Sequence, residues 1–445
     1  MPLVIIAGGR GTRLRQMTGD LPKSMVDVGG KPLLEHQILL ARQYGIRDVL
    51  ILTGFGSEHI EQYFGDGSAW GIRIQCHREE RPLGTAGALL EVFDKLEDLF
   101  LVMYGDTMMN VDLTRMRASH TGLASATLFV HPNDHPQDSD LVVLNNSGEV
   151  VALLPYPHPP DSYHRNLVNA ALYVFSKEPL RTCVTQWRQN PRSIDICKHL
   201  FPSLLKEGAL LRGYLSREYI KDAGTPNRLQ NVRRDYETGR VRASSFREPM
   251  PAVFLDRDGT VNFDHGWINA PEKIELLSGA ADAIRAINGS GRLAVIVTNQ
   301  PVVARGECDE PTLRRIHNKL EWLLGEAHAY VDAIYYCPHH PDAGFRGERA
   351  DLKMACFCRK PSPGLLEAAV RDLNIDVSRS WMIGDSRRDI KTAANFGIPA
   401  VLVKSNQRTF DDTRDEEPRL RVETALDAVN CILRGAAQSS EQLLH

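Results

Sequence analysis

The sequence lacks the features that mark secreted, membrane-spanning or nucleic-acid-coating proteins. Its formal net charge is −3, with 53 basic and 56 acidic side chains, so no basic surplus is available to coat a polyanion. No stretch reaches the roughly 18 apolar residues of a membrane-spanning helix, and no basic segment precedes the first apolar residues. The 8 cysteines in 445 residues are too few for a disulfide scaffold. We therefore expect a cytoplasmic protein that acts on small molecules, without nucleic-acid or membrane partners, and a homo-oligomer stays open.

What the sequence does contain is two series of short apolar runs that alternate with amphipathic stretches. The first series predicts buried strands at 3–7, 49–52 and 99–103, and a helix at 32–44. The second predicts strands at 252–255, 293–297, 381–383 and 400–403, and helices at 280–287 and 312–324. This rhythm is typical of mostly parallel sheets covered by helices. We expect the α/β class, with two Rossmann-like three-layer domains and no internal repeat.

The boundary between the two series falls in a polar segment rich in Arg and Ser that ends Pro-Met-Pro, which predicts a linker. The expected organisation is a first domain over 1–235, a linker over 236–250, a second domain over 251–407 and a C-terminal helix and tail over 408–445. The helix of that tail is expected at 422–433.

A glycine-rich segment follows the first predicted strand, where residues 7–14 read Ala-Gly-Gly-Arg-Gly-Thr-Arg-Leu. Glycines leave backbone N–H groups open to a phosphate, so Gly8, Gly9 and Gly11, with Thr12, are candidate phosphate-binding positions. Arg13 and Lys23 add positive charge. The alternative is that these glycines serve only the tight geometry of a strand-to-helix turn.

Together with Leu-Pro-Lys at 21–23, this segment resembles the signature of the sugar-1-phosphate nucleotidyltransferases. The resemblance continues through 29–33, 63–67, 82–87 and 105–106, and covers roughly residues 1–235. It implies a nucleotidyltransferase fold and attack by a sugar-1-phosphate oxygen on the α-phosphorus of a nucleoside triphosphate, with pyrophosphate leaving. Such a transfer depends mainly on alignment and charge neutralisation.

The same resemblance assigns further residues of the first half. It implies that Asp106 and Asp222 hold Mg²⁺, although alone the first could be a helix N-cap and the second a turn residue. It places the nucleobase at Gly84 and Thr85, and the sugar at Asn169, Asp195 and Lys198. The sequence departs from the family pattern at Ala171, where glycine is usual, and at His199, where an acid is commoner. A close-packed loop is the alternative for 195–202.

Two aspartates follow the first strand of the second series. Asp256 and Asp258 stand two apart in Asp-Arg-Asp-Gly-Thr, and phosphoryl transfer to a carboxylate needs one acid to attack and a second to protonate the leaving alcohol. An acidic turn or a calcium loop would be the simpler interpretation.

With 297–300, 359–361 and 383–385, these aspartates resemble the haloacid-dehalogenase-type phosphatases. The resemblance implies that Asp256 forms an aspartyl-phosphate, that Asp258 acts as acid and then base, and that Mg²⁺ binds at Asp256, Asp385 and the carbonyl of Asp258. Phosphoryl and substrate contacts are implied for Thr298, Asn299, Arg305, Arg359 and Lys360. Asp389 is either a supporting partner or an exposed helical acid.

Three cysteines crowd between 337 and 358, which favours a metal over a disulfide. The segments 258–266, 335–341 and 356–361 resemble the D-glycero-D-manno-heptose 1,7-bisphosphate 7-phosphatases and their histidinol-phosphatase cousins. Cys337, His339, Cys356 and Cys358 then form a Cys₃His set that suits structural zinc; reduced thiols with an incidental histidine are the alternative. Departures occur at 301–303, where Pro-Val-Val replaces Ser-Gly-Ile, and at Ser386, where Lys is frequent.

The two resemblances predict one bifunctional enzyme of nucleotide-sugar synthesis. Its phosphatase would convert heptose 1,7-bisphosphate to heptose 1-phosphate, and its transferase, which is similar to mannose-1-phosphate and heptose-1-phosphate guanylyltransferases, would use GTP to form GDP-heptose. Mg²⁺ and structural Zn²⁺ are the expected cofactors. The alternatives are an ADP-heptose or GDP-mannose type of transferase, a histidinol-phosphate type of phosphatase, and a non-catalytic sugar-nucleotide sensor.

Overall fold

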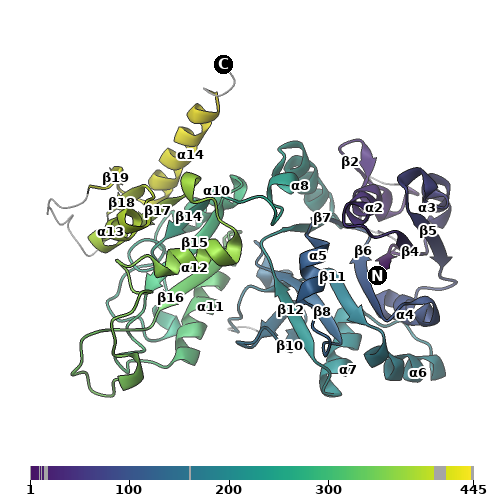
Figure 1. Ribbon diagram of the computed structural model, residues 1–445, viewed down its shortest axis with the longest axis horizontal. Coiled ribbons are helices and arrows are strands. Elements are labelled where there is room, and N and C mark those ends of the chain that lie inside the picture. The colour runs from purple at the N-terminus through teal and green to yellow at the C-terminus, as the bar shows by residue number, and fades with distance from the viewer. Residues whose placement is uncertain are drawn as a thin grey trace. The chain divides into compact units, whose positions relative to one another are not determined.

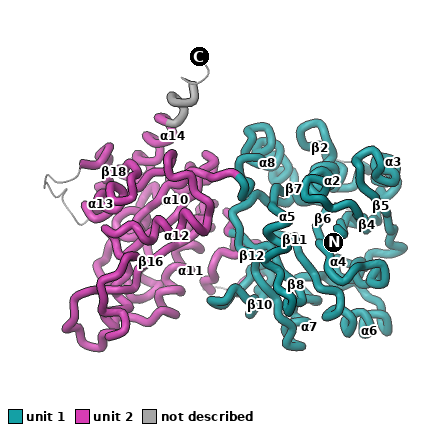
Figure 2. Tube along the Cα trace, viewed as in Figure 1, with its two compact units in different colours: residues 1–131, 140–156, 168–247 teal, residues 132–139, 157–167, 248–445 magenta. Residues whose placement is uncertain are grey.

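In the computed structural model, which describes residues 2–9, 11, 13–14, 19–159, 162–404 and 417–441, the chain forms two compact units (Figures 1 and 2). Unit 1 comprises residues 1–131, 140–156 and 168–247, and unit 2 comprises 132–139, 157–167 and 248–445. The predicted domain bounds stay predictions. The range predicted as a linker holds the end of helix α8 (Pro226–Glu237) and the short helix α9 (Arg240–Ala243).

Unit 1 is built on a nine-stranded sheet whose central strands are parallel. Its main path runs β10-β9-β11-β6-β1-β4-β5, and β8 pairs with both β11 and β12. The strands are β1 (Leu3–Ile6), β4 (Asp48–Thr53), β5 (Arg73–Arg78), β6 (Leu99–Tyr104), β8 (Ala126–His131), β9 (Leu141–Leu144), β10 (Val150–Leu154), β11 (Val168–Ser176) and β12 (Leu211–Leu215). A separate antiparallel pair joins β7 (Thr107–Asn110) to β13 (Tyr219–Asp222), and β2 (Asp27–Val28) pairs with β3 (Lys31–Pro32).

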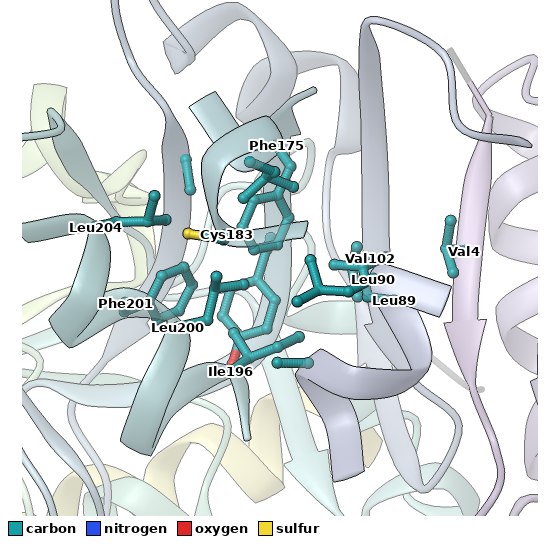
Figure 3. Packing of buried hydrophobic residues seen from close by; sticks show 14 of the residues in the cluster. Val4, Leu89, Leu90, Val102, Phe175, Cys183, Ile196, Leu200, Phe201 and Leu204 are labelled. Atoms are coloured by element: carbon teal, nitrogen blue, oxygen red, sulfur yellow. The ribbon is translucent and has the colours of Figure 1, made fainter. Parts of the chain in front are cut away.

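Both faces of this sheet are buried, because successive side chains of its central strands enter opposite cores. Val4 and Val102 pack against α4 (Gly84–Glu91), α6 (Arg181–Gln189) and α7 (Phe201–Lys206), as Figure 3 shows for their aromatic and aliphatic neighbours. Leu3 and Ile5 face α2 (Leu33–Gln43), α3 (Ser57–Phe64) and α5 (Leu113–Ser119). Two-sided burial explains why these strands read as continuous apolar runs.

Unit 2 has the same three-layer plan around a six-stranded parallel sheet, ordered β16-β15-β14-β17-β18-β19. The strands are β14 (Ala252–Leu255), β15 (Leu293–Asn299), β16 (Ala333–Cys337), β17 (Trp381–Gly384), β18 (Ala400–Val403) and β19 (Leu420–Val422). One face packs against α10 (Ala280–Gly289), α11 (Glu310–Glu326) and α14 (Ala425–Glu441). The other packs against α12 (Gly364–Leu373) and α13 (Arg387–Phe396).

Two segments from the first half of the sequence belong to unit 2, where they pack along α11. The backbone N–H of Asn166 donates to the buried carboxylate of Glu321 at 2.8 Å, and Gln137 donates to the carbonyl of Trp322 at 2.9 Å. Periodicity does not signal these contacts, because they join residues more than 150 positions apart.

The predicted fold class is confirmed, and most predicted elements are found within a residue or two of their expected ends. The last helix is the exception: Val422 belongs to β19, and the helix begins at Ala425. Leu420 and Val422 pair with β18, so the sheet takes Val422, which the apolar pattern assigned to the helix. Among the described residues, none of the helices combines the length and the apolar character needed to cross a bilayer.

Candidate active sites

In unit 2, the carboxyl ends of three neighbouring parallel strands bring the predicted phosphatase residues together. Asp256 follows β14, Thr298 lies near the end of β15, and Asp385 follows β17. Since β14 pairs with both β15 and β17, these side chains meet at one edge of the sheet. Carboxylate oxygens of Asp256, Asp385 and Asp389 lie within 4.8 Å of one another.

The buried Lys360 forms ion pairs with two of these carboxylates. Its ammonium lies 2.9 Å from Asp256 Oδ1 and 2.6 Å from Asp389 Oδ1, and the side chains of Lys360 and Asp389 are 1% and 0% exposed. Asp389 is therefore a buried partner, which excludes the exposed-acid alternative. Its other oxygen accepts hydrogen bonds from the backbone and hydroxyl of Ser386, which caps α13.

The charges of this cluster favour a divalent cation. Three carboxylates gather beside one ammonium, so two negative charges are left over when all three carboxylates are ionised. Burial and the charge of Asp389 raise the pKa of the Asp256 carboxyl, against the opposing effect of Lys360. Burial alone would lower the pKa of Lys360, but the two carboxylates outweigh it and raise that pKa. A magnesium ion, which prefers carboxylate oxygens, fits this donor set and this charge.

Asp258 is not a member of the carboxylate cluster, because its side chain is bound elsewhere. The fully buried Arg257 donates to both of its oxygens at 2.8 and 2.9 Å, and Asn262 and Gln300 each donate at 2.9 Å. Burial alone would raise the pKa of Asp258, but the Arg257 charge and these hydrogen bonds lower it. In this conformation Asp258 is an ionised carboxylate, the form of a base rather than of an acid.

The predicted phosphoryl-binding residues divide into two groups. Thr298 is buried and its hydroxyl oxygen accepts a hydrogen bond from Gln300, which leaves the O–H to donate to a ligand. Asn299 instead exchanges two hydrogen bonds of 3.0 Å with the backbone of Lys360. Arg359 donates to the carbonyl of His339 at 3.1 Å. Asn299 and Arg359 thus hold the loop that presents Lys360.

The four predicted zinc ligands converge into one cluster. The Sγ atoms of Cys337, Cys356 and Cys358 lie 3.3 to 3.5 Å apart, and His339 Nδ1 lies 3.3 Å from Cys358 Sγ and 3.6 Å from Cys337 Sγ. Thiolates at the usual distance from one tetrahedral zinc ion would be about 3.8 Å apart, so small outward shifts would accommodate the metal. Burial raises the pKa of Cys337, which a bound cation would oppose.

Arg305 lies in an aromatic setting that the sequence did not predict. Its guanidinium stacks over the rings of Trp267 at 3.9 Å and Phe345 at 4.4 Å, and one nitrogen contacts His340 Nε2 at 3.0 Å.

The segment 301–303, which departs from the family pattern, contributes to a small hydrophobic core. Val302 and Val303 are buried there together with Leu313.

In unit 1, the predicted phosphate loop leaves β1 between the ends of β4 and β6. Gly11 has a φ of +61°, and a Cβ there would lie 2.6 Å from Lys23 Cγ, so a side chain would strain the backbone and displace Lys23. A Cβ at Gly8 would lie 2.6 Å from a carboxylate oxygen of Glu79. Thr12 lies outside the described residues.

The charged residues predicted for nucleotidyl transfer meet beside Gly224. A Cβ at that glycine would lie 2.9 Å from Asp222 Oδ1, 3.7 Å from Arg13 Nη2 and 3.8 Å from Lys23 Nζ. Lys23 lies 3.4 Å from Asp106 Oδ2. The pairing of β7 with β13 brings Asp222 beside Thr107, and the N–H of Ala223 donates to the carbonyl of Asp106 at 2.8 Å. These two carboxylates could share metal ions.

The predicted base and sugar residues form a connected loop. Gly84, with a φ of +73°, packs against the carbonyl of Ile194, and the hydroxyl of Thr85 donates to Asp195 Oδ2 at 2.7 Å. The other oxygen of Asp195 accepts from the N–H groups of Cys197 and Lys198. Asp195 therefore caps the following helical turn, and the Lys198 side chain is exposed.

Asn169 is the predicted sugar residue that retains an unused polar atom. Its amide nitrogen donates to Tyr173 Oη and contacts Cys197 Sγ, both at 2.8 Å, while its buried Oδ1 has no hydrogen-bond partner among the residues that the structure describes. Two residues on, Ala171 has a φ of +55°, within a break in the pairing of β11 with β8. Alanine thus adopts the left-handed conformation that glycine would adopt more easily.

Comparison with known proteins identifies both halves. A family model described as nucleotidyl transferase matches residues 3–239, and one described as HAD-hydrolase-like matches 357–428. The D-glycero-β-D-manno-heptose-1,7-bisphosphate 7-phosphatase of Photorhabdus laumondii is 42% identical over 183 residues, which cover 41% of this chain and 95% of that protein. A solved D,D-heptose 1.7-bisphosphate phosphatase from B. bronchiseptica, complexed with magnesium and phosphate, is 32% identical with a TM-score of 0.37, covering 42% of this chain and 99% of that one. HddC from Yersinia pseudotuberculosis, complexed with GMP-PN, is 21% identical with a TM-score of 0.44, covering 53% and 99%.

The fold and the two sites thus define a two-part enzyme that combines a nucleotidyltransferase with a phosphatase of the haloacid-dehalogenase type. By family, the chain belongs to the nucleotidyl transferases through residues 3–239 and, through its C-terminal part, to the D-glycero-β-D-manno-heptose-1,7-bisphosphate 7-phosphatases. Both predicted resemblances are confirmed.

Several residues that build the sites were missed by sequence reasoning. Arg257 and Gln300 lie within the quoted motifs but were assigned no role, and Arg228 belongs to no motif; Arg228 pairs with Asp222 at 3.0 Å. The role of Asp389 had a usable signal, because Ser386-x-x-Asp389 before a helix is the pattern of a capping box.

Proposed function

We propose that this enzyme removes the 7-phosphate of D-glycero-D-manno-heptose 1,7-bisphosphate and then transfers GMP from GTP to the resulting heptose 1-phosphate, giving GDP-heptose and pyrophosphate. The observation that carries the proposal is the presence of both families in one chain, with relatives of the second named for a heptose bisphosphate. The phosphatase product is a sugar 1-phosphate, which is the class of acceptor that such a transferase consumes.

In the phosphatase step, Asp256 attacks phosphorus and the P–O bond to the sugar breaks, giving an aspartyl-phosphate and a sugar hydroxyl. Lys360 fixes the nucleophile's oxygen and supplies positive charge beside it, and the Thr298 hydroxyl is placed to donate to a phosphoryl oxygen. Magnesium at Asp256, Asp385 and the Asp258 carbonyl would reduce the repulsion between the carboxylate and the phosphate.

Asp258 handles the protons of both halves of this step. It must release Arg257 and gain a proton before it can protonate the leaving oxygen, because its bound form is ionised. It can then take a proton from the water that hydrolyses the aspartyl-phosphate. The ion pair with Arg257 thus stabilises the ionised form of Asp258, which can act as the base.

In the transfer step, the glycine loop, Arg13 and Lys23 bind the triphosphate, and Asp106 and Asp222 would hold Mg²⁺. Asp222, Arg13 and Lys23 converge around Gly224, and Lys23 also lies 3.4 Å from Asp106, which supports this assignment. Transfer at the α-phosphorus requires positive charge that neutralises the phosphate oxygens. Gly84, Thr85, Asn169, Asp195 and Lys198 stay assigned to base and sugar. Thr85 and Asp195 would act mainly by fixing the loop.

We also infer that Cys337, His339, Cys356 and Cys358 bind a structural zinc ion. All four donors are used, which leaves no position for a reacting water. The cluster lies next in sequence to Arg359 and Lys360, and Arg359 bonds to the carbonyl of His339, so the metal would hold the loop that carries Lys360.

The test is one reaction followed to its product. The full-length enzyme with Mg²⁺, heptose 1,7-bisphosphate and GTP should release inorganic phosphate and pyrophosphate and form GDP-heptose, detected by mass spectrometry. ATP, CTP and UTP in place of GTP serve as the comparison. Efficient hydrolysis of histidinol phosphate instead of the heptose ester, or ADP-heptose as the preferred product, would contradict the proposal.

A further inference from the structure

Arg228 forms an ion pair with one of the two carboxylates that are proposed to hold magnesium in unit 1. Its Nη1 lies 3.0 Å from Asp222 Oδ2 and 3.2 Å from Asp222 Oδ1, so one guanidinium nitrogen bridges both oxygens. Both side chains are partly exposed. The pair therefore lies where a metal ion can reach the carboxylate from solvent.

The backbone around the pair is fixed on both sides. Arg228 belongs to the first turn of α8, where its N–H donates to the hydroxyl of the N-cap Thr225 at 3.3 Å. Asp222 ends β13, and the N–H of the next residue, Ala223, donates to the carbonyl of Asp106 at 2.8 Å. Because neither backbone is free to turn, the ion pair sets the orientation of the Asp222 side chain.

The hydrogen bonds to Asp222 use most of its capacity as an acceptor. Oδ1 accepts from the N–H of Gly224 at 3.0 Å as well as from Arg228, whereas Oδ2 accepts from Arg228 alone within the described part of the chain. The two oxygens of a carboxylate together offer about four lone-pair positions. One position on Oδ2 is thus left for a metal ion, and a metal that takes both oxygens has to displace Arg228.

Magnesium and calcium differ in what they require of a carboxylate. Mg²⁺ demands a nearly ideal octahedron, keeps several waters, and is bound by one or two carboxylates together with substrate phosphates. Ca²⁺ is larger, takes about six to eight oxygens, and accepts both oxygens of one carboxylate. A carboxylate with a single available position therefore favours Mg²⁺.

We propose that Arg228 is a positioning residue that limits Asp222 to one metal-binding oxygen and thereby makes the transferase site select Mg²⁺ over Ca²⁺. The cation beside the other carboxylate imposes no such limit, since Lys23 contacts a single oxygen of Asp106 at 3.4 Å. Selectivity thus depends on the pair of Asp222 with Arg228. The inference rests on the metal site of the proposed nucleotidyl transfer, but not on the identity of the nucleotide or the sugar.

The experiment measures metal binding directly, in full-length enzyme that carries Asp385→Asn so that the phosphatase cluster lacks one of its proposed ligands. Bound Mn²⁺ is detected by electron paramagnetic resonance, and Mg²⁺ or Ca²⁺ is added to displace it. Arg228→Met should raise the ratio of Ca²⁺ affinity to Mg²⁺ affinity by about 10-fold or more, the scale on which the partners of metal ligands act. The ratio is measured because loss of the Arg228 charge strengthens the binding of both cations.

Three variants in the same background complete the test. Asp222→Asn should remove the Mn²⁺ signal of this site, and Arg228→Lys, which keeps a cation, should restore part of the selectivity. Arg234→Met, at an exposed position of the same helix, should leave the ratio unchanged. An unchanged ratio in Arg228→Met, or a Mn²⁺ signal that persists in Asp222→Asn, would overturn the inference. If the ratio shifts as expected but the wild type forms no GDP-heptose from GTP, only the proposed function is wrong.

Discussion

The two sites of this enzyme both act on phosphorus, but the protein completes them to different degrees. In unit 2, Lys360, Asp256 and Asp389 already contact one another with side chains 1%, 15% and 0% exposed. In unit 1, Lys23, Asp106 and Asp222 are 18%, 28% and 39% exposed. In the proposed mechanism the phosphatase supplies its own nucleophile, which requires a rigid, buried arrangement. The transferase joins two substrates, and these bring the nucleophile and much of the charge.

The largest expected effect comes from exchanging one carboxylate in each site. Asp256→Asn removes the proposed phosphatase nucleophile and should lower that activity by at least about 10³-fold, with pyrophosphate release from GTP and heptose 1-phosphate unchanged. Asp106→Asn should show the reverse pattern. Each variant is the control for the other, measured by phosphate and pyrophosphate release from one preparation. Loss of both activities in either variant would mean that the sites do not function separately.

Zinc should sharpen the contrast, because only unit 2 contains the cluster of four ligands within the described residues. Cys358→Ser should abolish zinc binding and lower the unfolding free energy of unit 2 by several kcal/mol, a fraction of the roughly 10 kcal/mol or more found for zinc-dependent peptides. Metal analysis and thermal unfolding measure both effects. Cys431→Ser changes an exposed cysteine of the same unit and should have no effect. Full zinc content in Cys358→Ser would disprove the assignment.

The two active-site lysines test the difference in burial directly. Lys360→Met leaves Asp256 and Asp389 facing each other without a cation, so we expect about 3–5 kcal/mol lower stability as well as loss of phosphatase activity. Lys23→Met breaks a partly exposed pair 3.4 Å long and should cost about 1 kcal/mol or less, although transfer should fail. Urea unfolding monitored by fluorescence compares them. Equal losses of stability would remove the distinction between a preassembled and an open site.

The sequence predicted the elements and the reacting residues better than it predicted their partners. The strands that carry Asp256, Thr298 and Asp385 could be placed because each is a short apolar run with its polar residue at the carboxyl end. Arg257 could not be assigned, since nothing in Asp-Arg-Asp shows that the middle side chain is fully buried and turned onto Asp258.

Some residues that were predicted to contact ligands form hydrogen bonds to other protein groups in the structure. Asn299 bonds to the backbone of Lys360, and Asp195 bonds to Thr85 and to the N–H groups that follow it. A motif identifies residue types and order, whereas the partner of a side chain depends on a loop brought in from 61 or 110 positions away. Such long-range contacts cannot be predicted from the spacing of residues in the sequence.

A smaller effect concerns the pH dependence of stability. Burial and the nearby charge of Arg257 lower the pKa of His317 on α11 to about 3, against 6.5 for an ordinary histidine. The unfolded chain takes up this proton as pH falls below 6.5 and the folded chain does not, so stability is lost in that direction. Between pH 6.5 and 5 we expect a loss of about 2 kcal/mol in unit 2.

His317→Leu should flatten this part of the stability profile, whereas His265→Leu, at an exposed position of the same unit, should not. Urea midpoints at several pH values provide the measurement. An unchanged pH profile in His317→Leu would show that other groups cause the acid sensitivity.

The smallest expected effect returns to the open site of unit 1. Ala171 holds a φ of +55° beside Asn169, whereas the comparable residue of unit 2, Asn374 with a φ of +49°, follows helix α12 as its C-cap. A left-handed alanine costs about 1–2 kcal/mol, and glycine gives back about 0.5–1 kcal/mol through its more flexible unfolded state. Ala171→Gly should therefore raise the stability of unit 1 by about 1 kcal/mol or less.

Two further glycine substitutions are the controls. Asn374→Gly should change the stability of unit 2 by only a few tenths of a kcal/mol, because asparagine already tolerates this conformation. Ala170→Gly, one residue away without a positive φ, should destabilise the protein. If Ala171→Gly is stabilising and also raises the KM for heptose 1-phosphate, the strained backbone serves to orient Asn169 toward the sugar.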